Sequence, residues 1–362
     1  PQGEPVQVRT DRTVNFNWIF ALPHPELDAN CFSVAWTGSV IMPKTMDGCI
    51  GLSTQDSMRL YVDDKLLIDG WGKDKSADQA LDFHFEAGRT YKIRIEFVND
   101  RRGARVIFGY SAGRENFPAA VEAARKADVA ILCMGDNEET SGENFDRTDL
   151  NLPGRQLELV QAVYATGTPV VLVLQSGRPV TANWENDHLP AILEAWFPGE
   201  QGGTAIAKTL FGNAAPGGRL PITFPRSVGQ IPCHYSRRPG GGKRYVEMDW
   251  LPLYPFGYGL TYTTFAYSDM TLSRSVIGPQ DTVTVSVTVT NTGKYTGDAV
   301  PQLYVRDMFS SVVKPERQLA AFRRLTLAPG ESRRVELTVG PKQLRTLGPD
   351  YVWRVEPGKF EL

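Results

Sequence analysis

The sequence predicts a multidomain protein of α/β and all-β parts: a β-sandwich, an α/β domain with a mostly parallel sheet, and a C-terminal β-sandwich. Three observations predict this. Apolar and polar residues alternate over 1–112 and again over 266–362, which is the period of half-buried strands. Between them, 113–265 carries short apolar runs that alternate with helical segments. At 362 residues, the chain is too long for one ordinary domain.

In the first region, the clearest period-two segments are 14–18, 32–36 and 91–97. Glycine and aspartate interrupt the alternation at 47–48 and 69–70, as expected of turns. Short strands at regular spacing are typical of a sandwich or a barrel.

The middle region changes period. The expected elements, in chain order, are a helix over 117–127 with Pro118 in its first turn, a strand over 128–134, a helix over 153–165, strands over 169–174 and 191–196, and a helix over 202–211. Continuous apolar strands between helices predict a parallel sheet covered on both faces. Cys133 lies in the first of these strands, so we expect a buried core thiol.

The last part of the middle region, 226–265, has no periodicity and predicts a loop-rich connector. Alternation returns at 282–290, where threonine and valine take turns, and continues at 299–305, 335–339 and 351–355. About 100 residues with this pattern match the size of a Greek-key sandwich.

Composition excludes several functions. The formal net charge of −2 lacks the basic footprint of a nucleic-acid binder. The longest apolar runs, such as 168–174, are too short to span a membrane. The four cysteines form no CxxC pair, so neither a zinc site nor a disulfide scaffold is indicated, and no metal or cofactor is expected. Because the chain begins at Pro1, in the middle of a strand-rich pattern, we expect a piece of a longer polypeptide.

The loop after the strand at 128–134 is the strongest candidate site. Ligands of an open α/β sheet gather at the carboxyl ends of its strands. Six carboxylates lie in this loop: Asp136, Glu138, Glu139, Glu143, Asp146 and Asp149. They indicate either a general acid and base or a solvated acidic surface. A metal site is disfavoured because no histidine joins them and no calcium-loop spacing is present.

Two other turns follow predicted strands of the same sheet. The segment 175–179, Gln-Ser-Gly-Arg-Pro, has too few glycines for a nucleotide fingerprint, and Ser176 lacks the frame of a hydrolase nucleophile. The glycines of 196–203 permit tight turns. Both turns are predicted to be structural.

Taken together, these stretches resemble glycoside hydrolase family 3. The motifs that carry the resemblance are LPGRQ at 152–156, SGRP at 176–179, AWFPGEQGG at 195–203, GGRLP at 217–221 and YPFGYGL at 254–260. Residues 266–362 resemble the fibronectin type III-like domain of that family. Residues 1–112 resemble a protective-antigen-type β-sandwich inserted into the second domain, which would then occupy 113–265.

The resemblance implies a retaining, exo-acting β-glycosidase, with β-glucosidase favoured and β-xylosidase as the alternative. Such an enzyme uses two carboxyl groups about 5–5.5 Å apart. Glu143, in Ser-Gly-Glu-x-Phe-Asp-Arg, matches the family's general acid/base. The nucleophile is an aspartate on a TIM barrel. We expect Asp146 and Arg147 to form an ion pair that fixes the loop, and Glu143 to be partly buried beside Phe145. Glu138, Glu139, Asp136 and Asp149 are weaker rivals.

This chain contains no barrel, and the first half of the second domain and the first strand of the inserted sandwich are also missing. The resemblance therefore implies a partner, the N-terminal TIM-barrel part of the same enzyme, as a separate or cleaved chain. A homo-oligomer is compatible with the sequence. The alternative function is a non-catalytic carbohydrate-binding or assembly subunit, which would not need the loop around Glu143.

Lectin-type relatives of the first domain hold calcium with a pair of aspartates. The corresponding pair here is Gln55-Asp56, so calcium-dependent sugar binding is not expected. The domain is instead expected to shape the aglycone side of the substrate cleft.

Overall fold

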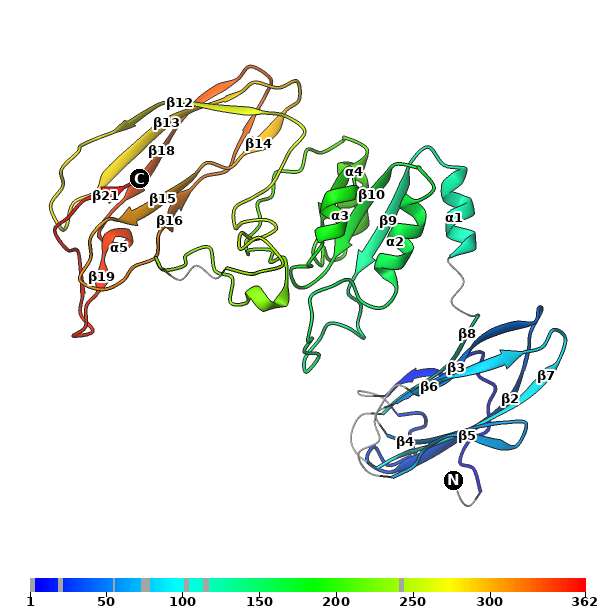
Figure 1. Ribbon diagram of the computed structural model, residues 1–362. Helices are drawn as coiled ribbons and strands as arrows, with labels where there is room; N and C mark the ends of the chain where they lie inside the picture. Colours follow the sequence, from blue (N-terminus) through cyan, green and yellow to red (C-terminus); the bar gives the residue numbers. More distant parts are fainter. Residues whose placement is uncertain are drawn as a thin grey trace. The chain divides into compact units, whose positions relative to one another are not determined.

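A computed structural model describes residues 4–18, 22–54, 56–72, 79–100, 104–112, 117–240 and 244–362 (Figure 1). The chain divides into two compact units, Pro1–Asn116 and Phe117–Leu362. Among the described residues, no helix has the length and apolar character needed to cross a membrane.

The first unit is a sandwich of two antiparallel four-stranded sheets, ordered β1-β8-β3-β6 and β2-β7-β4-β5. Its strands are β1 (Asn15–Asn17), β2 (Phe32–Ile41), β3 (Met46–Thr54), β4 (Ser57–Val62), β5 (Lys65–Gly70), β6 (Gln79–Phe85), β7 (Thr90–Asn99) and β8 (Arg105–Ala112). The all-β prediction for this region is confirmed. Gln55 of the expected Gln55-Asp56 pair lies outside the described residues.

The alternation of buried and partly exposed residues along the strands shows where the core of this sandwich lies. In β4, Met58 and Leu60 are fully buried, while the residues between them are partly exposed. Asp63 and Asp64 join β4 to β5 with positive φ values of 50° and 63°. Two residues with positive φ suit a tight hairpin because their twist matches that of the strands.

The second unit begins with a three-stranded parallel sheet, ordered β11-β10-β9, as predicted. Its elements are α1 (Pro118–Arg125), β9 (Ala130–Gly135), α2 (Gln156–Tyr164), β10 (Val170–Gln175), α3 (Asn183–His188), β11 (Ala191–Glu194) and α4 (Gly202–Leu210). Val160 of α2 packs with Leu172 and Leu174 of β10 in one core. Helix α3 was not predicted, because the six residues NWENDH show no helical period and have weak helix propensity.

The prediction of a buried Cys133 is wrong. Strand β10 lies in the middle of the sheet, and Val173 on it is fully buried. Strand β9 is an edge strand of the described sheet, and on it Leu132 packs into the core whereas Ile131 is 45% exposed and Cys133 is exposed. Within the described part of the chain, β9 is therefore covered on one face only.

The connector is loop-rich, as predicted. Between α4 and β12, the described residues contain one short helix, η1 (Val228–Gln230), and one isolated bridge between Phe224 and Tyr254. Within the connector, Tyr235 stacks on Phe256 with ring centroids 4.1 Å apart. The connector also contacts the domain that follows it, because the Tyr235 hydroxyl accepts a hydrogen bond from Leu319 N at 3.2 Å.

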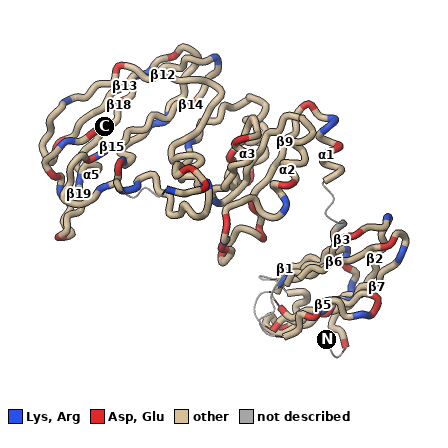
Figure 2. The backbone as a smooth tube through the Cα atoms, viewed as in Figure 1, with Lys and Arg blue, Asp and Glu red and all other residues tan. Residues whose placement is uncertain are grey.

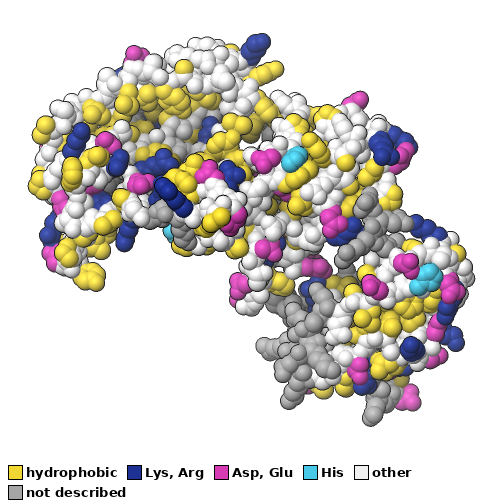
Figure 3. Space-filling model, viewed as in Figure 1, with side chains coloured by type: hydrophobic (Ala, Val, Ile, Leu, Met, Phe, Trp, Pro, Cys, Tyr) yellow, Lys and Arg dark blue, Asp and Glu magenta, His cyan; other side chains and the backbone are white. Residues whose placement is uncertain are grey.

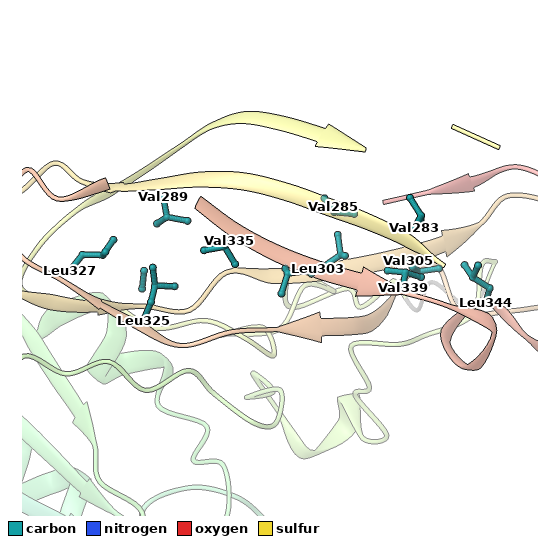
Figure 4. Close-up of a cluster of buried hydrophobic side chains, with 12 residues drawn as sticks. Val283, Val285, Val289, Leu303, Val305, Leu325, Leu327, Val335, Val339 and Leu344 are labelled. Atoms are coloured by element: carbon teal, nitrogen blue, oxygen red, sulfur yellow. The ribbon is translucent and has the colours of Figure 1, made fainter. Parts of the chain in front are cut away.

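The C-terminal domain is the predicted β-sandwich, with β12-β13-β18 as one sheet and β16-β15-β21 and β14-β17 opposite it (Figure 1). Its elements are β12 (Phe265–Leu272), β13 (Val283–Asn291), β14 (Gly297–Ala299), β15 (Gln302–Asp307), β16 (Gln318–Phe322), β17 (Leu325–Leu327), β18 (Ser332–Val339), α5 (Pro341–Leu344), β19 (Thr346–Leu347), β20 (Trp353–Arg354) and β21 (Phe360–Glu361). Figure 4 shows Val285 and Val289 of β13 among the valines and leucines of the facing strands. The valines of the Thr-Val repeat thus form the core.

Candidate active site

The carboxyl ends of β9, β10 and β11 lie at one edge of the sheet because the three strands are parallel. The chain leaves β9 at Gly135, whose φ of 140° an L-residue rarely adopts. The side-chain amide of Gln156, at the start of α2, bonds both backbone groups of Gly135, at 2.7 and 2.8 Å. Asp136 N donates to Gln175 O of β10 at 2.9 Å. These bonds fix the direction in which the acidic loop starts.

The first part of the acidic loop is a side-chain-supported turn. Ser141 N donates to Asn137 O at 3.0 Å, and the Thr140 hydroxyl accepts from Asn137 N at 3.0 Å. The same hydroxyl lies 3.1 Å from Asp136 Oδ1. Threonine and asparagine stabilise such turns because their short side chains reach nearby backbone groups.

Glu143 lies in the middle of a second turn. Phe145 N donates to Gly142 O at 3.2 Å, and Asn144 has a positive φ of 65°. The Phe145 ring packs on Gly142, where an added Cβ would lie 3.1 Å from the ring. Glu143 is exposed, so the expected partial burial is not found. None of the hydrogen bonds or ion pairs among the described residues involves its carboxylate.

The expected ion pair between Asp146 and Arg147 is wrong. Arg147 turns back to Asp136 instead, with Nη1 3.1 Å from Asp136 Oδ1. Its Nη2 donates to Asp149 Oδ1 at 3.2 Å and to Asn151 O at 2.7 Å. The Asp136 side chain is 2% exposed and that of Arg147 is 16% exposed, so this pair is mostly hidden from solvent.

The structure separates the rival carboxylates by environment. Asp136 is buried against arginine, and Asp149 accepts from Arg147, so both have structural partners. Glu138 and Glu139 are exposed on the first turn of the loop. Figure 2 shows acidic residues in red along the loop that leaves β9.

The turn after β10 contacts the acidic loop. Ser176 is fully buried, and its hydroxyl donates to Arg178 O at 2.8 Å. A Cβ added at Gly177 would lie 2.7 Å from the Phe197 ring and 3.2 Å from Ser141 Oγ, so only glycine fits where the three loops meet. This crowding agrees with the predicted structural role of both turns.

Sequence reasoning missed Glu194, the last residue of β11. Burial raises the pKa of the Glu194 carboxyl to about 7. Its Oε1 accepts a hydrogen bond from Trp196 N at 2.9 Å, and Trp196 has a positive φ of 53°. The sequence signal that could have identified Glu194 is its position as the single carboxylate at the end of an apolar strand.

The described residues contain no group of three or more His, Cys, Asp or Glu side chains placed to hold a metal ion. Two cavities of about 630 and 260 Å³ in the second unit lie elsewhere, where the connector meets the C-terminal sandwich. Hydrophobic side chains gather on the surface of that sandwich (Figure 3), including Tyr267 and Met270 at the rim of the larger cavity.

A parallel α/β sheet with an exposed carboxylate on the loop after one strand, followed by a β-sandwich, defines a multidomain protein with a candidate proton-transfer group at the carboxyl ends of the strands. Comparison with known families makes the assignment specific. Residues 27–262 match the glycosyl hydrolase family 3 C-terminal domain, and residues 299–362 match the fibronectin type III-like domain. The first match covers more than half of the chain, so the chain belongs to glycosyl hydrolase family 3.

Relatives carry two kinds of name. A β-xylosidase of Formosa agariphila is 46% identical over 75% of this chain and 39% of its own length. A β-glucosidase of Rhizobium radiobacter is 35% identical over 100% of this chain and 48% of its own. A solved β-glucosidase from Kluyveromyces marxianus, in complex with glucose, has a TM-score of 0.73 and 28% identity, over 99% of this chain and 45% of that one. The chain spans less than half the length of these relatives.

Proposed function

We propose that this chain is the C-terminal part of a retaining, exo-acting β-glycosidase in which Glu143 is the general acid/base. The observation that carries the proposal is the environment of the Glu143 side chain. It is exposed in the middle of a turn, without a partner among the described residues, at the sheet edge where ligands of open α/β sheets gather. The rival Asp136, by contrast, is buried and paired.

In this reaction an aspartate, on a barrel that this chain does not contain, attacks the anomeric carbon. Glu143 gives its proton to the glycosidic oxygen as the bond to the aglycone breaks. The same carboxylate then takes a proton from water, which attacks the glycosyl-enzyme and releases the sugar with its configuration retained. An acid/base has to be open to substrate and water, as the exposed Glu143 is on this chain.

The test replaces Glu143 with alanine in the full-length protein. Glu143→Ala is expected to lower turnover of a disaccharide by about 10²–10⁴-fold, because its leaving group needs a proton. An activated aryl glycoside should still react in the first step, and the glycosyl-enzyme should then accumulate. Azide should restore turnover and yield a β-glycosyl azide, because azide attacks without a base. Both steps are measured by stopped-flow and steady-state kinetics.

Glu138→Ala is the matched control, since Glu138 is an exposed carboxylate of the same loop. It should leave both substrates unaffected. Equal loss on both substrates in Glu143→Ala, with no rescue by azide, would show that Glu143 is not the acid/base. No activity of any kind in the full-length protein would favour the alternative, a non-catalytic carbohydrate-binding or assembly subunit.

The proposed substrate is a β-glucoside or a β-linked oligosaccharide with a terminal glucose. A relative that aligns along the whole of this chain is a β-glucosidase. β-Xylosidase is the second candidate, favoured by the 46% identity to the Formosa agariphila protein. The same kinetic assay distinguishes them when aryl β-glucoside and aryl β-xyloside are compared by kcat/KM.

A further inference from the structure

A cluster of charged side chains around the buried carboxylate of Asp136 connects the two ends of the segment that carries Glu143. We define it as Asp136, Arg147, Asp149 and Arg178. Asp136 directly follows β9, and Arg147 lies four residues after Glu143. The contact of 3.1 Å between Arg147 Nη1 and Asp136 Oδ1 therefore closes the loop at its base.

Arg147 is held from several sides. Its Nη2 donates to Asn151 O at 2.7 Å and to Asp149 Oδ1 at 3.2 Å. Asn151 is itself anchored, since its Oδ1 accepts from the Thr181 hydroxyl at 2.6 Å. A guanidinium presents its donors in a rigid planar fork, so Arg147 can bridge acceptors on both ends of the loop at once, which a lysine ammonium cannot do as well.

Arg178 connects the same cluster to the turn after β10. Its Nη2 lies 3.4 Å from Ser141 Oγ, and its Nε lies 3.8 Å from Asp136 Oδ2. Ser141 is two residues before Glu143. The loop is thus held to the neighbouring strand on one side of Glu143 and to its own base on the other.

We infer that Arg147 is a positioning residue for the reaction, acting through Asp136 to fix Glu143; this inference rests on the proposed function. Glu143 makes no contact of its own that would fix it within the described chain, so its position depends on the anchors of the loop. A general acid must lie within hydrogen-bond reach of the oxygen that it protonates. A displacement of about 1 Å can lower a rate by about 10²-fold.

The test compares Arg147→Ala and Arg147→Lys with Arg333→Ala in the full-length protein. Arg333 is the matched control because it is an exposed arginine that pairs with Glu331 on the C-terminal sandwich. Arg147→Ala should lower kcat on a disaccharide by about 10²-fold with KM little changed. It should change the first step with an activated aryl glycoside by less than about 5-fold, because that step needs no acid. Arg147→Lys should fall between, and Arg333→Ala should match the wild type.

Two further variants keep the inference falsifiable. Arg147→Ala removes the nearer of the two arginines beside the buried carboxylate of Asp136. The folded state is therefore preserved better by combining Asp136→Asn with Arg147→Gln, and this double variant should show the same dependence on the leaving group. Combining Glu143→Ala with Arg147→Ala should lower kcat no further than Glu143→Ala alone, because residues that act through one another are not additive.

The outcomes separate the two claims. If Glu143→Ala shows no dependence on the leaving group, the proposed function is wrong, and the inference falls with it. Suppose that Glu143→Ala behaves as expected. If Arg147→Ala then matches Arg333→Ala, or loses activity equally on both substrates, only the inference about Arg147 is overturned. A full additional loss in the double variant would likewise assign Arg147 a role independent of Glu143.

Discussion

Glu194 shows how one buried side chain makes folding depend on pH. Its carboxyl is enclosed at the end of β11, and burial raises its pKa to about 7 from an ordinary 4.5. The folded state therefore holds the proton more tightly than the unfolded state does. The free energy of unfolding should consequently fall as the pH rises from about 4.5 to about 7, and this contribution should stay constant above that range.

We predict that Glu194→Gln removes this contribution. Glutamine keeps the acceptor for Trp196 N and carries no charge. A pKa shift of this size corresponds to at most about 3 kcal/mol. The free energy of unfolding of the variant should therefore exceed that of the wild type by up to this amount at pH 8 and equal it at pH 4. Urea unfolding at both pH values measures the difference. Glu200→Gln, at an exposed site six residues after Glu194, is the control and should show no such trend.

At the scale of elements, a buried asparagine joins the end of β13 to its neighbours. Asn291 is fully buried, and its Nδ2 donates to Tyr295 O at 2.8 Å and to Leu327 O at 2.9 Å. Its Oδ1 accepts from the Thr263 hydroxyl of the connector at 2.6 Å. One side chain therefore holds two strands and the connector together.

Asn291→Ala should lower the free energy of unfolding by about 3 kcal/mol, because it leaves the buried Leu327 carbonyl and the buried Thr263 hydroxyl without this partner. Thr290→Ala, which removes an exposed hydroxyl contact with Ser332, should lower it by less than about 1 kcal/mol. Thermal unfolding of both variants provides the comparison. Equal losses would mean that the buried network of Asn291 contributes no more than a surface contact does.

At the scale of the whole molecule, β9 presents an apolar face that the described chain leaves open. Val129 is 48% exposed, Ile131 is 45% exposed, and Cys133 is exposed beside them. Parallel strands are normally covered on both faces. If this chain is the C-terminal part of a longer enzyme, as proposed above, we expect the rest of that enzyme to cover this face.

Thiol labelling tests that expectation. In residues 1–362 alone, Cys133 should react with a water-soluble maleimide about as fast as a free cysteine, because it is exposed. In the full-length protein it should be protected until the protein is unfolded with urea. The rate is measured by peptide mass spectrometry. Equal labelling of Cys133 in both forms would show that nothing covers β9, and glycosidase activity of residues 1–362 alone would show that no other part is needed.

The sequence alone predicted much of this fold because the relevant signals are local. The Thr-Val repeat of β13 and the apolar run of β10 each report which faces of a strand are buried. It failed for α3, whose polar residues carry no period. The sequence also failed to predict the exposure of Cys133. A strand is buried on both faces only when another part of the protein packs on each face, and the sequence of the strand does not report whether such a part is present.

The candidate site also has some features that the sequence predicts and others that only the tertiary structure decides. The residues between 136 and 149, and the turn after β10, could be placed at one sheet edge from strand order alone. The partner of Arg147 could not, because Asp146 is adjacent in sequence whereas Asp136 is brought near only when the loop closes on its own base. The burial that raises the pKa of Glu194 likewise comes from packing between loops. The sequence by itself determined most of the elements and the acidic loop. Tertiary structure decided which charges are paired, because pairing depends on distance in space.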